Sequence, residues 1–259
     1  MKALRWNEDR HKDTEEQSDK VFSKTERFIK FSGFVPVFLL PMCLIKTMKI
    51  KVYRNLMGAN DKWANKTRAL LAKENVKMLN LIGSPGAGKT ALLEQTVKKN
   101  SHRAFAVLEG DIETRNDAER LARLGCEVSQ LLTGGGCHLE AKMVHHALRD
   151  LPLHRLDLVI VENVGNLVCP AEFDIGEHAK VVVLSVTEGE DKPLKYPVIF
   201  REARAIVVSK IDLLPHVPFK LKLCLEFIRK INPHAPVFKV SAMTGKGIKE
   251  WIDWLTAAG

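Results

Sequence analysis

Two short loops of this 259-residue chain carry side chains that could bind a metal ion. Residues 133–139 read TGGGCHL and place Cys137 beside His138, and residues 166–174 read NLVCPAEFD and contain Cys169. Thiolate and imidazole groups bind borderline divalent metals, in tetrahedral geometry for Zn²⁺ and in planar or tetragonal geometry for Ni²⁺. These three residues are therefore candidate ligands for Ni²⁺ or Zn²⁺.

The spacing of these ligands alone is a weak predictor, because an adjacent Cys-His pair is not a zinc-finger pattern. The alternative is a buried thiol next to a histidine in the first turn of a helix. Three ligands from one chain leave a coordination position open, and two chains could also share the ion across an interface. His145 falls on the same helical face as His138, but we expect it to be solvated.

A glycine-rich loop predicts phosphate binding. Residues 83–90 read GSPGAGKT and fit the pattern G-x-x-x-x-G-K-S/T, between a predicted strand and a predicted helix. The glycines let the backbone curl so that successive N–H groups point at phosphate oxygens, and the helix adds the positive end of its dipole. Lys89 would reach the β- and γ-phosphates, and the Thr90 hydroxyl would bind Mg²⁺. The predicted phosphate-binding residues are Gly83, Ser84, Gly86, Ala87, Gly88, Lys89, Thr90 and Ala91.

Two further loops favour guanine as the base. The stretch VVSKID places Lys210 and Asp212 after a strand. A carboxylate there can accept hydrogen bonds from both N1–H and the N2 amino group of guanine, and adenine has no such pair of donors. GTPases usually carry asparagine where this chain has Ser209, so we expect one base contact to be weakened or altered. After the next strand, the backbone of Ser241 and Ala242 could contact the guanine O6.

Carboxylates at two strand ends are candidate Mg²⁺ ligands. Asp111 follows the second predicted strand, and Glu162 ends a later one. Either could bind Mg²⁺ directly or through water, Glu162 could act only by orienting a water molecule, and capping of a strand–helix turn is the alternative for both. Gly165, near the γ-phosphate, could move on hydrolysis. Asp111, Lys89 and Thr90 form the candidate catalytic set, and no glutamine stands out as a general base.

The elements that must position these loops alternate along the chain. Strands that are apolar on both faces and are separated by helices indicate a parallel sheet covered on both sides, with ligands at the carboxyl ends of its strands. The predicted fold class is α/β, a P-loop NTPase with a mostly parallel sheet flanked by helices on both faces. The predicted strands cover residues 76–82, 103–110, 127–133, 156–162, 180–186, 205–210 and 236–242. The predicted helices cover residues 60–74, with Asn60 or Asp61 as N-cap, and residues 89–99, 116–125, 138–151, 219–231 and 247–255.

The basic charge of the chain lies in its N-terminal part. The formal net charge is +9, to which residues 1–47 contribute +2 (nine Lys/Arg, seven Asp/Glu) and residues 48–77 contribute +6 (eight against two), leaving +1. A near-neutral body argues against a polynucleotide groove, so we expect no nucleic acid as a partner. We expect a basic helical segment at residues 48–75 and a nucleotide-binding domain at residues 76–259.

The first 47 residues form an N-terminal extension. Within it, residues 31–45 are apolar, but they are short for a transmembrane helix and contain two prolines. They also sit late for a signal peptide and lack a small-residue cleavage site. Translation from Met48 is the simpler interpretation, which makes residues 1–47 a mis-assigned start. The alternative is a loosely ordered leader.

The five cysteines indicate a reducing compartment. They have no spaced framework and their number is odd, which argues against a disulfide scaffold. Cys126 and Cys224 lie in helical or apolar contexts, so we expect them in the core. We therefore expect a cytoplasmic protein without a membrane partner.

Several of the stretches described above together resemble the HypB family, the nickel-incorporation GTPases of nickel–iron hydrogenase maturation. The resemblance covers about residues 48–259. The GTPases of urease maturation share the fold, but ENVGNLVCPAEFD is typical of the hydrogenase branch. The resemblance rests on LIGSPGAGKTALLEQT, LEGDIET, TGGGCHLEAKMV, VIVENVGNLVCPAEFDIGE, VVVLSVTEGEDKPLKYP, SKIDLLP and VSAMTGKGIKEWIDWL.

The resemblance implies a slow, regulatory GTPase whose cofactors are GTP, Mg²⁺ and Ni²⁺, with Zn²⁺ as an alternative at the nickel site. It implies a homodimer formed on GTP or metal binding, with Cys137, His138 and Cys169 beside the switch elements. GTP binding would then order the metal site, and hydrolysis would release the metal. The implied partners are the small nickel chaperone HypA, which the basic helix could dock, and the hydrogenase large-subunit precursor.

This chain departs from some members of that family at its N-terminus. Those members carry an additional nickel site of clustered cysteines or a histidine-rich tract, whereas only His11 and Cys43 occur here before residue 60. We therefore expect no second nickel site and no nickel store. Two other functions stay open: urease maturation, and a nickel carrier in which the nucleotide controls only assembly.

Overall fold

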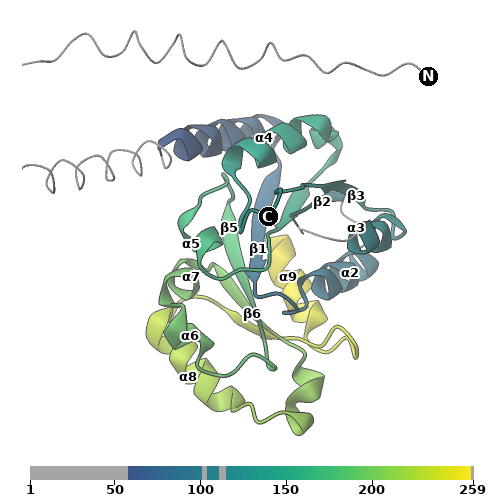
Figure 1. The fold of residues 1–259 in the computed structure, drawn as a ribbon. Coiled ribbons are helices and arrows are strands. Elements are labelled where there is room, and N and C mark those ends of the chain that lie inside the picture. Colours follow the sequence, from purple (N-terminus) through teal and green to yellow (C-terminus); the bar gives the residue numbers. More distant parts are fainter. Residues whose placement is uncertain (1–57, 101–103, 111–114, 258–259) are drawn as a thin grey trace, which may run out of the picture. The chain divides into compact units, whose positions relative to one another are not determined.

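Seven strands form one sheet in the order β3-β2-β4-β1-β5-β6-β7, and every pair of neighbours is parallel (Figure 1). The computed structural model describes residues 58–100, 104–110 and 115–257, all within one unit of the chain. The N-terminal extension, Asp111, His11 and Cys43 lie outside these residues. The strands are β1 Lys77–Gly83, β2 Phe105–Glu109, β3 Glu127–Gln130, β4 Leu158–Glu162, β5 Ala179–Ser185, β6 Ala205–Ser209 and β7 Val237–Lys239.

Helices cover both faces of this sheet, as predicted (Figure 1). A helix over residues 58–74 precedes β1. The α-helices that follow are α2 Lys89–Lys99, α3 Arg115–Ala122, α4 Ala141–Asp150, α5 Cys169–Glu172, α6 Lys192–Lys195, α7 Pro197–Glu202, α8 Leu221–Ile231 and α9 Ile248–Ala257. Two 3₁₀ helices are η2 Leu153–Arg155 and η3 Ile211–His216.

Successive side chains of β1 point to opposite faces of the sheet, so this strand contributes to the helix layers on both faces. Leu79 and Leu81 pack into a core cluster with α2, α3 and α9 on one face of the sheet. Met78 points to the other face, where it packs with the helix over residues 58–74 and with α4. On that same face, Ile82 packs with α7 and α8. Both faces are covered, and β2, β4 and β6 are accordingly apolar at every residue except the last, so the α/β prediction is confirmed.

The N-cap prediction for the first helix is wrong. The helix already includes residues 58 and 59, so Asn60 and Asp61 lie inside it. The Asn60 side chain instead serves another helix: its Oδ1 accepts a hydrogen bond from Ala141 N at 3.0 Å, and its Nδ2 donates to Asp174 O at 2.7 Å. Asn60 therefore caps the first turn of α4 from a distant part of the sequence.

Two element boundaries matter for the site. β3 ends at Gln130 and not at residue 133, and α4 begins at Ala141 and not at residue 138. Cys137 and His138 therefore lie in a loop between these elements and not in a helix. Three short helices, α5, α6 and α7, were not predicted, because four to six residues are too few to show a helical period.

Candidate nucleotide and metal site

The glycine-rich loop connects the carboxyl end of β1 to the N-terminus of α2, as the motif requires. Gly86 and Gly88 have φ values of 71° and 90°, in the left-handed region that favours glycine. At Gly83 a Cβ atom would lie 2.6 Å from the Val183 carbonyl oxygen, so there is no room for a side chain. Three glycines of the motif are therefore fixed by geometry, and the loop forms a cradle for phosphate oxygens.

Lys89 and Thr90 begin α2 at this cradle. The Lys89 side chain is buried, and its Nζ donates to the carbonyl oxygens of Gly83 and Ser84, both at 3.4 Å. The Thr90 hydroxyl donates to Glu162 Oε1 at 3.0 Å. The ammonium group thus lies inside the loop, and a hydroxyl and a carboxylate face each other beside it. Ala87 is buried and Ala91 is half-buried in the same loop and first turn.

The loop after β6 is fastened to the phosphate loop. Ser209 Oγ is buried and donates to Ala87 O at 2.6 Å, and Lys210 Nζ donates to Gly86 O at 2.6 Å. Lys210 itself has a φ of 57°, a left-handed conformation that is uncommon for a residue with a side chain. Ser209, which stands where asparagine was expected, therefore positions the phosphate loop, and the sequence did not indicate this partner.

The other predicted base-binding residues lie at the same edge of the sheet. Asp212 is half-buried in η3, directly after β6. Ser241 is buried after β7, and its Oγ accepts a hydrogen bond from Thr244 N at 3.1 Å. A backbone hydrogen bond from Ile211 N to Val240 O at 3.2 Å joins the two loops. Ala242 follows and is half-buried, so the predicted base-binding residues come from neighbouring strand ends.

Oxygen donors beside the phosphate loop fit Mg²⁺. Glu162 is buried, and the hydroxyl of Thr90 contacts its carboxylate, which is the hard donor set that Mg²⁺ prefers. Asp111 lies outside the described residues. A second buried carboxylate, Glu109, was not predicted, and it lies opposite Glu162 in the register of β2 and β4. Its position as the last residue of a strand was the available sequence signal.

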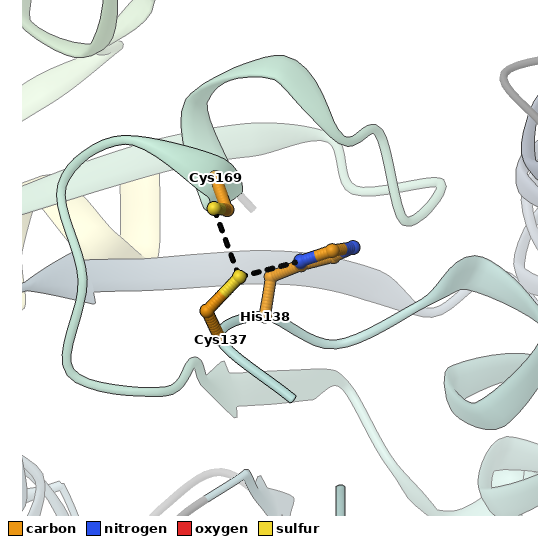
Figure 2. A group of neighbouring side chains, drawn as sticks. All are labelled: Cys137, His138 and Cys169. Atoms are coloured by element: carbon orange, nitrogen blue, oxygen red, sulfur yellow. Dashed lines mark hydrogen bonds between the residues drawn. The ribbon is translucent and has the colours of Figure 1, made fainter. Parts of the chain in front are cut away.

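The structure brings the three candidate soft ligands together. Figure 2 shows Cys137 between Cys169 and His138: Sγ to Sγ is 2.9 Å, and Cys137 Sγ to His138 Nδ1 is 3.4 Å. One ligand atom from each of the three residues lies within 4.8 Å of the others. Cys137 is exposed and Cys169 is partly exposed, whereas Cys126 and Cys224 are buried as predicted.

The electrostatics of this cluster suit a soft metal. Burial lowers the pKa of His138, so its ring stays neutral and able to donate a lone pair near neutral pH. Its Nε2 atom is buried and makes no hydrogen bond with any described residue. The hydrogen bond with Cys137 and desolvation by burial raise the pKa of the Cys169 thiol. A divalent cation bound by this sulfur would therefore displace a proton from it.

His145 does not join this cluster. It is half-buried, its ring centroid lies 5.2 Å from that of Trp63, and its Nδ1 is 3.4 Å from Thr67 Oγ1. The loop that carries His138 ends before α4 begins, so the helical face that was expected to relate the two histidines does not exist. His145 instead packs α4 against the helix over residues 58–74.

A cavity of about 490 Å³ lies at the opposite edge of the sheet. It is lined by the first residues of β1, β4 and β5, with Arg204 and Trp254 nearby. Since parallel sheets of this kind bind ligands at the carboxyl ends of their strands, we assign no nucleotide to it.

Among the described helices, none is both long enough and apolar enough to cross a membrane.

Comparisons with known proteins agree with this geometry. The family model described as CobW/HypB/UreG, nucleotide-binding domain, matches residues 77–239. The hydrogenase maturation factor HypB of Azotobacter vinelandii is 46% identical over 213 residues, which are 82% of this chain and 70% of that protein. The hydrogenase/urease maturation factor HypB of Helicobacter pylori strain J99 is 38% identical over 210 residues, which are 80% of this chain and 86% of that protein.

A solved structure gives the same result. The crystal structure of HypB from Helicobacter pylori in complex with nickel matches this chain with a TM-score of 0.74 at 38% sequence identity. The match covers 77% of this chain and 94% of that chain. The residues that the family model matches, 77–239, include the phosphate loop and Cys137, His138 and Cys169.

Proposed function

The chain belongs to the CobW/HypB/UreG family, among the hydrogenase maturation factors, and from this premise we propose that it is a GTP-hydrolysing nickel metallochaperone. It delivers Ni²⁺ during maturation of nickel–iron hydrogenase. The observation that carries this proposal is the convergence of Cys137, His138 and Cys169 within 4.8 Å, next to a strand end that also contacts the phosphate loop.

The nucleotide part of the site performs ordinary P-loop chemistry. Backbone N–H groups of the phosphate loop, other than at Pro85, and the Lys89 ammonium bind the phosphates, and the N-terminus of α2 adds a partial positive charge. Thr90 and Glu162 would hold Mg²⁺, which neutralises charge that develops on the β- and γ-phosphates. Asp212 would select guanine, and Lys210 is held over the loop by Gly86 O. We assign no general base and expect slow turnover.

The metal part of the site holds Ni²⁺ as cargo. Two thiolates and one imidazole supply three ligands and leave room for a further ligand from water, from a partner or from a second copy of the chain. The same donors accept Zn²⁺. Ligand exchange at the open position would let the ion leave toward a receiving protein.

The two parts share the segment that follows β4. Glu162 contacts Thr90, and Cys169 begins α5 seven residues later. A nucleotide-dependent movement of residues 162–169 would therefore change the distances between the metal ligands. The coupling is reciprocal by thermodynamic necessity, so nickel should also change nucleotide affinity.

The proposal also covers the oligomeric state of the chain and the proteins that it binds. We propose a homodimer formed on binding of GTP or metal, the small chaperone HypA as a docking partner of the basic segment at residues 48–75, and the hydrogenase large-subunit precursor as the recipient. Residues 76–259 form the nucleotide-binding domain, and residues 1–47 are an extension. The site of action is the cytoplasm.

Metal titration in three nucleotide states tests the proposal. Nickel binding is measured calorimetrically for nucleotide-free protein, for the GDP complex and for the complex with a non-hydrolysable GTP analogue, with oligomer mass followed by light scattering. We expect one Ni²⁺ per chain or per dimer, with an affinity that depends on the nucleotide. Equal affinity in all three states, together with hydrolysis unaffected by nickel, would sink the proposal.

Two alternatives have their own tests. The Helicobacter pylori relative is named as a hydrogenase/urease factor, so urease maturation is the second candidate target. Complementation of a strain that lacks its own maturation GTPase, scored for both enzymes, separates these targets. A carrier in which the nucleotide controls only assembly would still deliver nickel after the Lys89→Ala substitution, whereas a hydrolysis-driven chaperone would not.

A further inference from the structure

Residues 162–169 lie between the phosphate loop and the metal-ligand loop, and they contact the phosphate loop at two points. Thr90 Oγ1 donates to Glu162 Oε1 at 3.0 Å. Gly165 packs against Pro85, since a Cβ atom at Gly165 would lie 2.8 Å from Pro85 Cγ and 2.9 Å from Pro85 N. A displacement of the phosphate loop toward this segment therefore meets backbone, with no flexible side chain to absorb it.

The same segment holds the metal-ligand loop through two asparagine side chains. Asn163 Oδ1 accepts a hydrogen bond from Leu139 N at 3.2 Å. Asn166 Nδ2 donates to Cys137 O at 3.1 Å. These contacts fall on the residues directly before and after His138, so the backbone is held on both sides of this ligand.

Neither asparagine is free to move without its neighbours. Asn163 is 2% exposed, its Oδ1 also accepts from Val164 N at 2.9 Å, and its Nδ2 donates to Asn80 Oδ1 at 3.1 Å. Asn80 belongs to β1 and is fully buried. Asn166 Oδ1 accepts from Val168 N at 2.8 Å, which fixes the backbone next to Cys169. A buried amide with its hydrogen bonds made resists rearrangement, because a lost partner leaves an unsatisfied polar group.

We propose that Asn163 and Asn166 are the positioning residues that transmit nucleotide state to the metal ligands. The inference rests on the proposed function, because it assumes that nucleotide and nickel binding are coupled. Neither residue is among the proposed nucleotide-binding residues or the candidate metal ligands. They join the segment after β4 to the loop of Cys137 and His138, so that these parts move as one body.

The readout is the ratio of nickel dissociation constants in the GDP complex and in the GTP-analogue complex of the full chain. The thiolate-to-nickel charge-transfer absorption reports binding independently of hydrolysis. If the wild-type ratio is about tenfold, a common size for allosteric coupling, we expect about twofold or less for Asn166→Ala. Asn163→Ala should bring the ratio close to one, and Asn163→Asp should retain more of it, because a carboxylate oxygen still accepts from Leu139 N.

Asn232 supplies a matched control. It is also a buried asparagine with several hydrogen bonds, to Phe200 O, Ala203 O and Ala235 N among others, but it lies away from the site. Asn232→Ala should lower thermal stability and leave the ratio unchanged.

The outcomes separate the inference from the proposed function. A wild-type ratio of one overturns the inference and, if nickel also leaves hydrolysis unchanged, removes the proposed function itself. A wild-type ratio that survives in Asn166→Ala, with nickel still bound, overturns the inference and leaves the function standing. If Asn163→Ala does not fold, Asn166→Ala decides alone, because its side chain is partly exposed and its loss leaves the core intact.

Discussion

The phosphate loop and the metal-ligand loop lie on either side of residues 162–169, but different interactions hold them. The phosphate loop is held by rigid elements: it lies between β1 and α2, and Ser209 and Lys210 from the end of β6 bond its carbonyl oxygens. The metal-ligand loop is exposed at Cys137 and follows two glycines with positive φ, Gly134 and Gly135.

The phosphate loop is therefore a preorganised site, whereas the geometry of the metal site depends on how two separate segments are positioned. The phosphate cradle is shaped by hydrogen bonds within the chain, which suits the proposed binding of a triphosphate in every cycle. The metal ligands come from the loop before α4 and from the first residue of α5, and the side chains of Asn163 and Asn166 help to align them. Under the proposed function, a rigid phosphate loop would transmit a change of nucleotide to these more exposed ligands.

The largest expected effect comes from Lys89→Ala. Loss of the ammonium from the phosphate cradle should reduce GTP hydrolysis on the order of 100- to 1,000-fold, because the charge that develops on the phosphates is no longer balanced. Steady-state phosphate release measures this. Lys98→Ala, at the far end of α2, is the control. Nickel affinity without nucleotide should stay at the wild-type value, and its loss would show that Lys89 also supports the metal site.

Cys137→Ala tests whether the metal site can be lost while the nucleotide site keeps its affinity. Removal of the central thiolate should weaken nickel binding by about 100-fold or more, since two ligands cannot hold the ion in place of three. GTP affinity should stay within about twofold of wild type, because no phosphate-binding group changes. Isothermal titration gives both values, and Cys126→Ala is the buried control. Unchanged nickel stoichiometry in the Cys137 variant would exclude this metal site.

The rate of thiol modification can be compared between the cysteines of the metal site and the buried cysteines of the core. Burial raises the pKa of the Cys126 thiol to about 11 and that of Cys224 to about 12, so neither forms thiolate near neutral pH. We expect iodoacetamide to modify Cys137 and Cys169 at least about tenfold faster than these two, as measured by peptide mass spectrometry. Nickel should protect the fast pair. Equal rates in native protein would contradict the difference in exposure.

Ser209→Ala tests how far the phosphate loop depends on its fastening. Loss of the hydroxyl leaves Ala87 O without its 2.6 Å partner, and we expect GTP to bind about fivefold more weakly, equivalent to about 1 kcal/mol. Ser185 lies opposite Ser209 in the register of β5 and β6, and its hydroxyl bonds Thr187, so Ser185→Ala is the matched control. Fluorescent GTP-analogue titration gives both affinities, and a Ser209 variant with wild-type affinity would show that the cradle does not need this bond.

Much of the nucleotide site could be predicted because its signals are local. A strand, a glycine pattern and a helix follow one another in residues 77–99, and each can be recognised from its neighbours in sequence. The predicted metal ligands depended on the resemblance to a known family, since the spacing of Cys137, His138 and Cys169 alone was weak. Their convergence is a consequence of the fold, which brings together loops thirty residues apart.

The residues that were not predicted act through contacts between distant parts of the sequence. Asn60 was expected to start its own helix, but it caps α4, and Asn163 binds Leu139 from a strand end. Side-chain amides can bond any backbone group that comes near, so their partners are decided by tertiary structure. Ser209 is similar, because its departure from the usual asparagine was visible while its bond to Ala87 O was not.

The place of β1 in the sheet has a consequence for synthesis on the ribosome. It is the first strand, but it pairs with β4 and β5, so that Leu79 lies between Ile160 and Ala179. Such non-local pairings form slowly, because closing a long loop costs conformational entropy before the stabilising contacts can form. The phosphate cradle therefore lacks β5 and the hydrogen bonds from Ser209 and Lys210 until most of the chain has emerged, and nascent chains that stop before β5 should show no affinity for GTP.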